Sequence, residues 1–182
     1  MAEMKTSNSS WIGPLSQARA NLAAEKAKAP EALRVALLGI GNELNGDDAV
    51  GVAVVRALAR RLADRPQFVC LVGGTAPENT TGALRRFAPD WVLLIDAVDA
   101  GREPGEILWA DWRDAEGLSA STHTLPPTLL ARYLTSEFGC GVGLLGAQPY
   151  AMEFGQGMSP VVRRAARREK KIENIAIVRI EQ

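Results

Sequence analysis

The sequence is poor in the residues from which many metal sites and nucleophile sites are built. Its 182 residues include one histidine, His123, and two cysteines, Cys70 and Cys140. The cysteines lack the C-x-x-C spacing of a zinc or redox site and do not suggest a disulfide framework. No G-x-S-x-G segment occurs, which excludes the nucleophile elbow of a serine hydrolase. The alternating chain also lacks the two β-rich halves of a two-lobed aspartic protease.

Neither an excess of one charge nor a long apolar run is present. Lys plus Arg and Asp plus Glu both number 21, which argues against a general nucleic-acid binder. No apolar run approaches the roughly 20 residues of a membrane span. Residues 1–30 lack the apolar segment of a signal peptide. We therefore expect a cytoplasmic protein, without membrane insertion and without nucleic acid as a partner.

What is present is a regular alternation of apolar runs and amphipathic segments. A hydrophobic content of 47% in a chain of this length fits one well-buried domain. The alternation predicts an α/β fold, a three-layer, twisted and mainly parallel sheet with helices on both faces. Strands are expected at residues 34–40, 68–72, 92–95, 105–110, 142–147 and 175–180, and helices at 77–87, 127–138 and 159–171, with a further helix opened by Asp47 and Asp48.

The N-terminal part of the chain differs from the rest in its amino-acid composition. Residues 1–31 are rich in Ala, Ser and Lys, and we expect them to form an appendage with a helix over 15–29 that Pro30 ends. The core is expected to begin at Arg34, within a single domain of residues 32–182. The sequence thus predicts a short N-terminal appendage followed by one larger domain.

Three residues stand where predicted strands or helices give way to loops. Asp48 follows the first strand, Asp96 ends the third, and His123 lies in a loop that enters a helix. In parallel α/β sheets the binding crevice lies beyond the carboxyl ends of the strands. Two oxygen donors and one imidazole can bind a borderline divalent metal and leave coordination positions free. We therefore expect an open metal-binding site at this edge.

The segment around Asp48 has competing interpretations. Gly39-Ile-Gly41 suggests a dinucleotide fingerprint, but Leu44 occupies the place of the third glycine. Asp47 and Asp48 would also put negative charge where pyrophosphate has to bind. One aspartate can simply cap the helix. We assign the cap to Asp47 and the site to Asp48.

Seven ordered segments carry a resemblance to a known family. They span residues 37–42, 46–51, 73–79, 93–97, 104–107, 122–126 and 146–149, and include Gly-Asp-Asp-Ala-Val-Gly and Gly-Gly-Thr-Ala-Pro-Glu-Asn. In these segments the chain resembles the maturation endopeptidases of NiFe hydrogenases, which remove the C-terminal extension of the hydrogenase large subunit. The resemblance covers nearly all of the predicted core and implies the same layered α/β fold.

The resemblance implies a function and a site. It implies an aspartyl-type endopeptidase that cuts the large-subunit precursor after nickel insertion and recognises the nickel carried by that substrate. The metal-binding positions of the family fall on Asp48, Asp96 and His123. No cofactor is expected to be permanently bound, although other divalent ions can occupy the site. The partner is then the large-subunit precursor, and the protein is expected to act as a monomer.

One departure from the family concerns the catalytic base. Members of the family usually carry an acidic residue directly before the Gly-Gly pair, where this chain has Val72. Asp47, Glu43, Asp99 or Glu78 can substitute, and Asp47 is the nearest in sequence to the site. We therefore predict Asp48, Asp96 and Asp47 as catalytic residues. The alternative that Val72 leaves open is a non-catalytic chaperone that checks the large subunit for nickel.

Overall fold

The computed structural model describes residues 11–114, 119–120 and 127–169. The described strands are β1 (Val35–Ile40), β2 (Phe68–Gly74), β3 (Trp91–Asp99), β4 (Ile107–Asp111), β5 (Ser119–Ala120) and β6 (Gly141–Ala147). They form a sheet in the order β2-β1-β3-β6-β4, in which β2, β1, β3 and β6 run parallel and β4 is an antiparallel edge. The short β5 pairs with the end of β3. The predicted mainly parallel sheet is confirmed.

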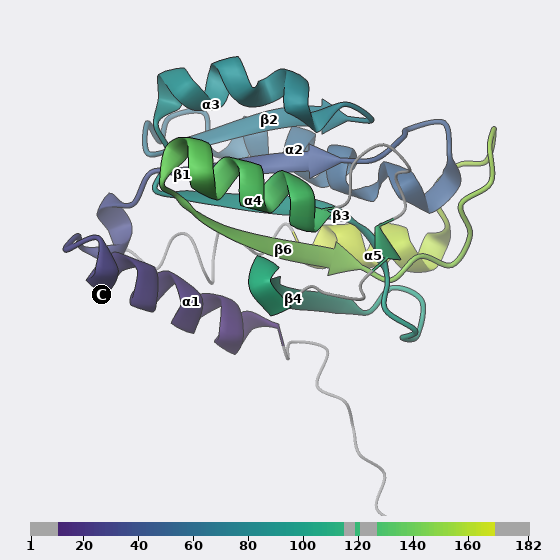
Figure 1. The fold of residues 1–182 in the computed structure, drawn as a ribbon. Helices are drawn as coiled ribbons and strands as arrows, with labels where there is room; N and C mark the ends of the chain where they lie inside the picture. The colour runs from purple at the N-terminus through teal and green to yellow at the C-terminus, as the bar shows by residue number, and fades with distance from the viewer. Residues whose placement is uncertain (1–10, 115–118, 121–126, 170–182) are drawn as a thin grey trace, which may run out of the picture.

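Helices cover both faces of this sheet, as Figure 1 shows. The helices are α1 (Ile12–Glu25), α2 (Val50–Arg61), α3 (Thr81–Phe87), α4 (Pro127–Phe138) and α5 (Pro160–Glu169). Buried residues of α1, α2 and α5 share one hydrophobic cluster with one face of the sheet, and α3 and α4 share a second cluster with the other face. Every residue of β1 is buried, because both of its faces are covered. The three-layer, single-domain prediction is thus confirmed.

The N-terminal helix is part of the core. We expected the core to begin at Arg34, and this is wrong, because Trp11, Leu15 and Leu22 belong to the larger hydrophobic cluster. The helix also begins and ends earlier than predicted. It ends at Glu25 because Ala27 adopts a left-handed conformation and the Lys28 amide turns back to the carbonyl of Ala23.

Other element bounds differ from the prediction in ways that matter for the site. The helix opened by Asp47 and Asp48 begins as a 3₁₀ turn, η2 (Gly46–Ala49), before α2. The helix expected at 77–87 divides into η3 (Pro77–Thr80) and α3. The third strand continues through Asp96 to Asp99. The strand expected at 175–180 and the last residues of the final helix lie outside the described residues.

Among the described helices, none is long and apolar enough to cross a membrane.

Candidate functional site at the carboxyl edge of the sheet

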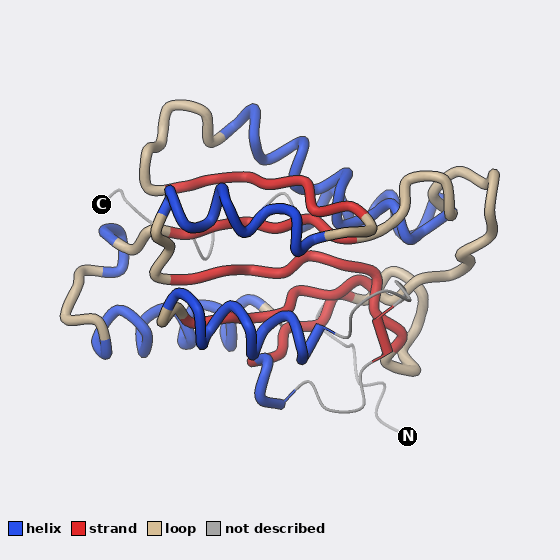
Figure 2. The backbone as a smooth tube through the Cα atoms, turned by 45° about the horizontal axis from the view of Figure 1, so that its top comes forward, coloured by secondary structure: helices blue, strands red, loops and turns tan. Residues whose placement is uncertain are grey.

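Asp48 and Asp96 lie at the same edge of the sheet. β1 and β3 are parallel neighbours, and their register pairs Gly39 with Ile95, which puts Ile40 level with Asp96. The loop after β1 leads directly to η2, which carries Asp48 and contacts β3. Figure 2 shows the loops that follow the strands projecting from this edge. The structure therefore brings two of the three predicted ligands to one edge.

The backbone around Asp48 is packed too closely for side chains. Gly41 has φ +127°, and a Cβ added there would lie 1.8 Å from the carbonyl oxygen of Asp48. A Cβ at Gly51 would lie 2.0 Å from the carbonyl oxygen of Ile95. Both positions therefore require glycine. The glycines of this segment serve the close approach of η2 and α2 to β1 and β3, which explains their spacing without a dinucleotide.

The two carboxylates are almost completely buried. Asp48 is 1% exposed, and its Oδ2 accepts a hydrogen bond of 2.9 Å from the amide of Asn42. Asp96 is 0% exposed, and its Oδ1 accepts a hydrogen bond of 2.8 Å from the amide of Ala97. Burying a carboxylate is costly unless a partner offsets the lost hydration. Each of the two carboxylates therefore has part of its lost hydration replaced by a backbone amide.

His123, the third predicted ligand, lies outside the described residues. The chain approaches it through β5, in which Ala120 pairs with Val98 and Ser119 with Asp99. That pairing brings the backbone to the end of β3, two positions beyond Asp96. Within the described part of the chain, no group of three or more His, Cys, Asp or Glu side chains is placed to hold a metal.

Asp47 has a different role from the helix cap that we predicted. Neither η2 nor α2 has a side-chain hydrogen bond at its N-cap. The Asp47 carboxylate is 0% exposed and accepts hydrogen bonds from the segment that follows β6. Its donors are the amides of Tyr150 (2.8 Å), Ala151 (3.0 Å) and Ser159 (2.6 Å), and the Ser159 hydroxyl (2.9 Å). Asp47 therefore joins the loop after β1 to the loop after β6.

The other carboxylates considered as substitutes for the missing acid differ in their surroundings. Glu43 is paired with Arg56. Asp99 accepts hydrogen bonds from the Gln148 side-chain amide (3.0 Å) and the Gly101 amide (3.1 Å), which hold the pKa of Asp99 below its usual value. Glu78 is exposed, and no described residue is hydrogen-bonded to its carboxylate. Of these three, Glu78 is the one available to a ligand.

Neither cysteine suits a nucleophile. Cys140 is buried and Cys70 is partly buried. Burial raises the pKa of each thiol to about 11, so both are protonated at neutral pH. A protonated thiol is a weak nucleophile. This agrees with the absence of a cysteine-based catalytic motif in the sequence.

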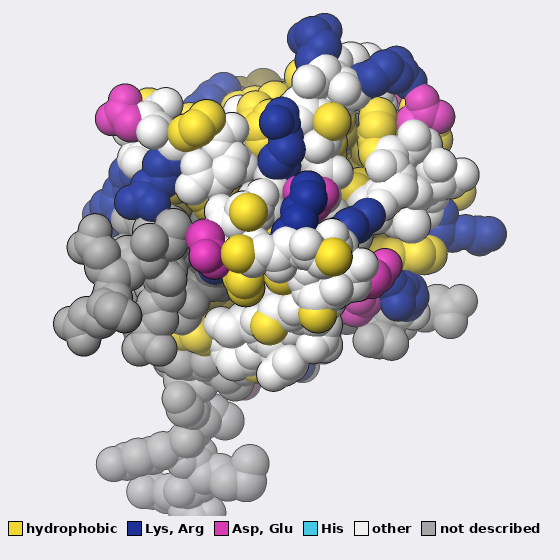
Figure 3. Space-filling model, turned by 90° about the vertical axis from the view of Figure 1, so that its left-hand side faces the viewer, with side chains coloured by type: hydrophobic (Ala, Val, Ile, Leu, Met, Phe, Trp, Pro, Cys, Tyr) yellow, Lys and Arg dark blue, Asp and Glu magenta, His cyan; other side chains and the backbone are white. Residues whose placement is uncertain are grey.

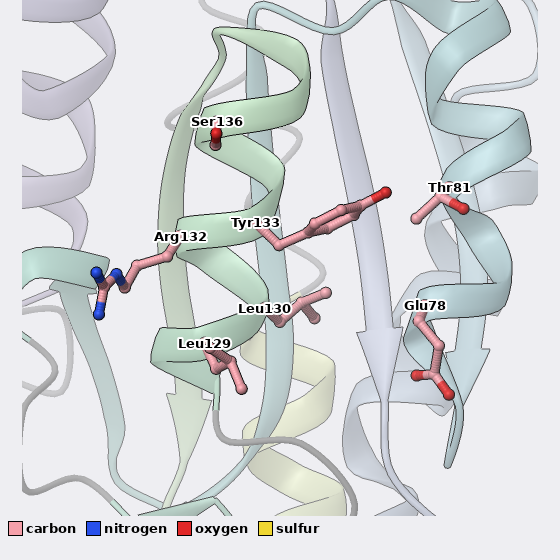
Figure 4. Close-up of a pocket in the computed structure, with 7 residues that line it drawn as sticks. All are labelled: Glu78, Thr81, Leu129, Leu130, Arg132, Tyr133 and Ser136. Atoms are coloured by element: carbon pink, nitrogen blue, oxygen red, sulfur yellow. The ribbon is translucent and has the colours of Figure 1, made fainter.

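A groove of about 840 Å³ lies beside the edge, between η3–α3 and α4. Figure 4 shows Tyr133 reaching across it from α4 toward Thr81 on α3, with Glu78 and Leu129 at one end. That end is the carboxyl edge of the sheet, because η3 follows β2 and α4 begins there. Its lining consists of Glu78, Thr81, Leu129, Leu130, Arg132, Tyr133 and Ser136.

Two polar residues that support this edge were not predicted from the sequence. Gln148 is 6% exposed, and its Oε1 accepts hydrogen bonds from the amides of Ala100 (2.8 Å) and Arg102 (3.1 Å). Ser159 joins Asp47 and also accepts a hydrogen bond from the amide of Val162 in α5. Gln148 falls in one of the segments that carry the family resemblance, but no chemical motif marked it. Ser159 stands before Pro160, which is an N-cap signal.

Comparisons with known proteins show the family to which the chain belongs. A family model described as "HycI: Hydrogenase maturation protease" matches residues 52–175. The hydrogenase 3 maturation protease of Escherichia coli K12 is 36% identical over 130 residues, which cover 71% of this chain and 81% of that protein. The hydrogenase 2 maturation protease of the same organism is 30% identical over 138 residues, covering 71% of this chain and 82% of that protein.

A solved structure supports the same assignment. The crystal structure of the NiFe hydrogenase maturation protease HycI from Thermococcus kodakarensis KOD1 is 33% identical and has a TM-score of 0.72. The match covers 80% of this chain and 92% of that one. The family model spans well over half of the chain, and the relatives match over most of their length. The chain therefore belongs to the hydrogenase maturation protease family and is a peptide-bond hydrolase.

Proposed function

We propose that this protein is an endopeptidase that removes the C-terminal extension of a NiFe hydrogenase large-subunit precursor after nickel insertion. The observation that carries the proposal is the pair of buried carboxylates, Asp48 and Asp96, at one edge of the sheet in a chain of this family. His123 completes the set as the nitrogen ligand. The nickel arrives with the substrate, and the protein holds no permanent cofactor.

The proposed chemistry depends on orientation. Nickel on the substrate binds to Asp48, Asp96 and His123 and fixes the C-terminal segment against this edge, as imidazole and carboxylate ligands allow. A water then adds to the carbonyl carbon of the scissile amide, the carbon–nitrogen bond breaks, and the leaving nitrogen takes a proton. Holding the reacting groups in place lowers the barrier, and the metal polarises the carbonyl. Asp47, which we predicted as a catalytic residue, acts instead as a positioning residue, because its carboxylate accepts four hydrogen bonds from the loop after β6.

We propose Glu78 as the substitute for the acid that the family usually carries before the Gly-Gly pair. Glu78 is exposed at the end of the groove that opens at the carboxyl edge. It lies four residues after Gly74, whose carbonyl accepts the amide of Gly41. This places η3 beside the segment that contacts Asp48. A carboxylate there can accept the proton of the attacking water.

The matched pair Glu78→Gln and Glu43→Gln tests this assignment. Glu78→Gln removes the base and lowers kcat by about a hundredfold or more, the usual contribution of a general base. Glu43→Gln alters an exposed carboxylate that is paired with Arg56, and kcat stays near that of the wild type. Steady-state cleavage of the precursor measures both variants. Equal kcat values for the two variants and the wild type would show that Glu78 is not the general base.

The proposed setting is the cytoplasm, with the protein as a monomer. The surface that meets the precursor includes the loop of residues 73–79 and the chain of residues 110–126, part of which lies outside the described residues. Three arginines of α5, Arg163, Arg164 and Arg167, are exposed and form a secondary contact surface. Exposed positive charges of this kind raise the rate of association with an acidic partner, and this effect becomes smaller at high salt.

One experiment separates the protease from the nickel-checking chaperone that Val72 leaves open. The purified protein is incubated with nickel-loaded large-subunit precursor, and the mass of the large subunit is followed. A protease shortens the precursor at one position, whereas a chaperone binds it and leaves its length unchanged. Asp48→Asn serves as the control, because loss of a metal-binding carboxylate stops cutting by the protease.

A further inference from the structure

Two loops beside Asp48 carry a cluster of exposed apolar side chains. Seven large apolar residues are exposed in the described chain, and four of them lie on the loop after β1 and the loop after β6. These four are Leu44 (60% exposed), Tyr150 (71%), Met152 (37%) and Phe154 (77%). We call them the two-loop patch. Figures 1 and 2 both show these loops side by side beyond the carboxyl ends of the strands.

The two loops are joined into one unit by the backbone. The Gly155 amide donates to the carbonyl of Leu44 (2.8 Å), and the Gly46 amide donates to that of Gln156 (3.2 Å). The Asp47 amide donates to the carbonyl of Ala151 (3.0 Å), and the Asp47 carboxylate accepts from the amide of the neighbouring Tyr150 (2.8 Å). These bonds fix the backbone from which the four side chains project. Leaving large apolar side chains in water on a fixed framework is unfavourable and marks an interaction site.

The face of the molecule at the opposite edge of the sheet shows no comparable group of large apolar side chains among its described residues. Figure 3 looks at the amino ends of the strands, where apolar side chains appear as small separate areas between Lys, Arg, Asp and Glu. Scattered apolar residues of this kind are normal on a protein surface. The enrichment in large apolar residues therefore belongs to the edge that carries the candidate site.

The position of the two-loop patch restricts what can cover it. The amide of Asn42, two residues before Leu44, donates to the Asp48 carboxylate. A protein that brings a peptide bond to Asp48 and Asp96 must therefore cover the loop of residues 42–46 as well. A second copy of this chain seated on the patch would cover the same edge and exclude the substrate. This favours the substrate protein over self-association.

We propose that the two-loop patch is the docking surface for the folded body of the large-subunit precursor, and that it binds an apolar area next to the segment to be cut. The proposal rests on the proposed function of the site. Tyr, Phe and Met are enriched at protein interfaces, where a few such residues supply most of the binding energy. The patch binds the precursor before and after the peptide bond breaks, so it contributes to substrate affinity and not to the chemical step.

The test compares Phe154→Ser and Leu44→Ser with Glu153→Ser, a polar and exposed control on the same loop. Each apolar variant weakens binding of nickel-loaded precursor about tenfold or more, as removal of an interface anchor does. The KM for processing rises by the same factor as the loss of binding, and kcat stays near the wild-type value. The temperature of thermal unfolding is unchanged because these side chains are exposed. Glu153→Ser binds and cuts like the wild type.

Three results would overturn the proposal, and they are distinguishable. If both apolar variants had the KM of the wild type, the two-loop patch would not be a docking surface, and the proposed protease function would still stand. A wild-type dimer that Phe154→Ser converts to a monomer in sedimentation would assign the patch to a second copy of the chain. A wild-type protein that neither binds nor cuts the precursor would overturn the proposed function and the docking partner with it.

Discussion

Asp47 and Asp48 are neighbours in the sequence with different surroundings in the structure. Asp47 satisfies three backbone amides and one hydroxyl of the 150–159 segment. Asp48 accepts the Asn42 amide at the edge shared with Asp96. The Asp47 carboxylate therefore supports the structure of two loops, whereas our proposal assigns Asp48 to the site.

Substitution by asparagine separates these two roles. Asp47→Asn turns an amide NH₂ toward backbone N–H donors, so it lowers the free energy of unfolding by about 2–4 kcal/mol. Asp48→Asn keeps an oxygen for the Asn42 amide and removes one of two neighbouring negative charges, so stability stays within about 1 kcal/mol or rises. Urea unfolding measures both. Processing is abolished by Asp48→Asn, and a large loss of stability in that variant would make Asp48 a structural residue.

We expect His123 to decide whether the isolated protein binds metal. With one nitrogen and two oxygen ligands and no thiolate, the site is expected to bind divalent ions weakly, with Ni, Zn and Cd preferred over Mg. His123→Ala removes the nitrogen ligand and abolishes this binding. Titration calorimetry with each metal ion measures the affinity. Equal nickel affinity in the variant and the wild type would place the metal elsewhere.

At the residue scale, the local sequence pattern predicted the position of Asp48 at the carboxyl edge but did not predict the hydrogen bonds of Asp47. Asp48 and Asp96 were predicted because each follows an apolar run in the sequence, and in the structure Asp96 lies within β3, level with the end of β1. The partners of Asp47 are 103 to 112 residues further along the chain, so no nearby spacing points to them. The cap predicted for Asp47 was wrong because the helix begins with a 3₁₀ turn whose N-cap is Asn45.

At the scale of elements, strands were predicted better than the N-terminal helix. Strands buried on both faces appear in the sequence as unbroken apolar runs, which explains why β1 was predicted almost to its bounds and why the apolar part of β3 was found. The buried side of α1 includes Leu15, Arg19 and Leu22, so an arginine interrupts its apolar stripe. That arginine is 8% exposed and donates to the carbonyl of Pro30 (2.7 Å). Such a partner becomes visible only when the chain is folded.

The end of α1 is attached to the sheet by Lys28 and Asp90. Lys28 Nζ lies 2.7 Å from Asp90 Oδ1, and the Arg34 amide donates to Asp90 Oδ2 (2.9 Å). Burial raises the pKa of Asp90, but the Arg34 amide and Lys28 outweigh it, so the pKa lies below its usual 3.8. A lowered carboxyl pKa stabilises the fold above the unfolded-state value, and this stabilisation is lost as the pH falls through the folded-state value.

Asp90→Asn therefore has an effect that depends on pH. At neutral pH the variant is less stable than the wild type, because the charged partner of Lys28 is gone. As the pH falls below the usual value of 3.8, the carboxylate of the unfolded chain takes up a proton before that of the folded protein, and the difference in unfolding free energy between the two proteins shrinks. Urea unfolding at several pH values measures that difference. A difference that stays constant down to pH 3 would show that the charge of Asp90 contributes nothing.

At the scale of the whole molecule, the parallel sheet explains why distant residues meet. Asp48 and Asp96 are far apart in the sequence, yet Asp48 follows β1 and Asp96 lies in the parallel neighbour β3, level with the end of β1 at the carboxyl edge. This part of the site could be predicted from the alternation of strands and helices. The two-loop patch could not, because Leu44 and Phe154 come together through backbone hydrogen bonds between two irregular loops.

The arrangement of the molecule also predicts its specificity. The described residues include no deep catalytic triad, and the carboxylates are nearly inaccessible, so casein and short peptides are expected to stay uncut. Cleavage should need the folded large subunit with its nickel, since the ion orients the scissile segment against Asp48 and Asp96. The measurement compares cleavage of nickel-loaded and nickel-free precursor under the same conditions. We expect the nickel-free form to be cut at least about a hundredfold more slowly. Cleavage of both forms at similar rates would refute nickel recognition while leaving the peptidase itself in place.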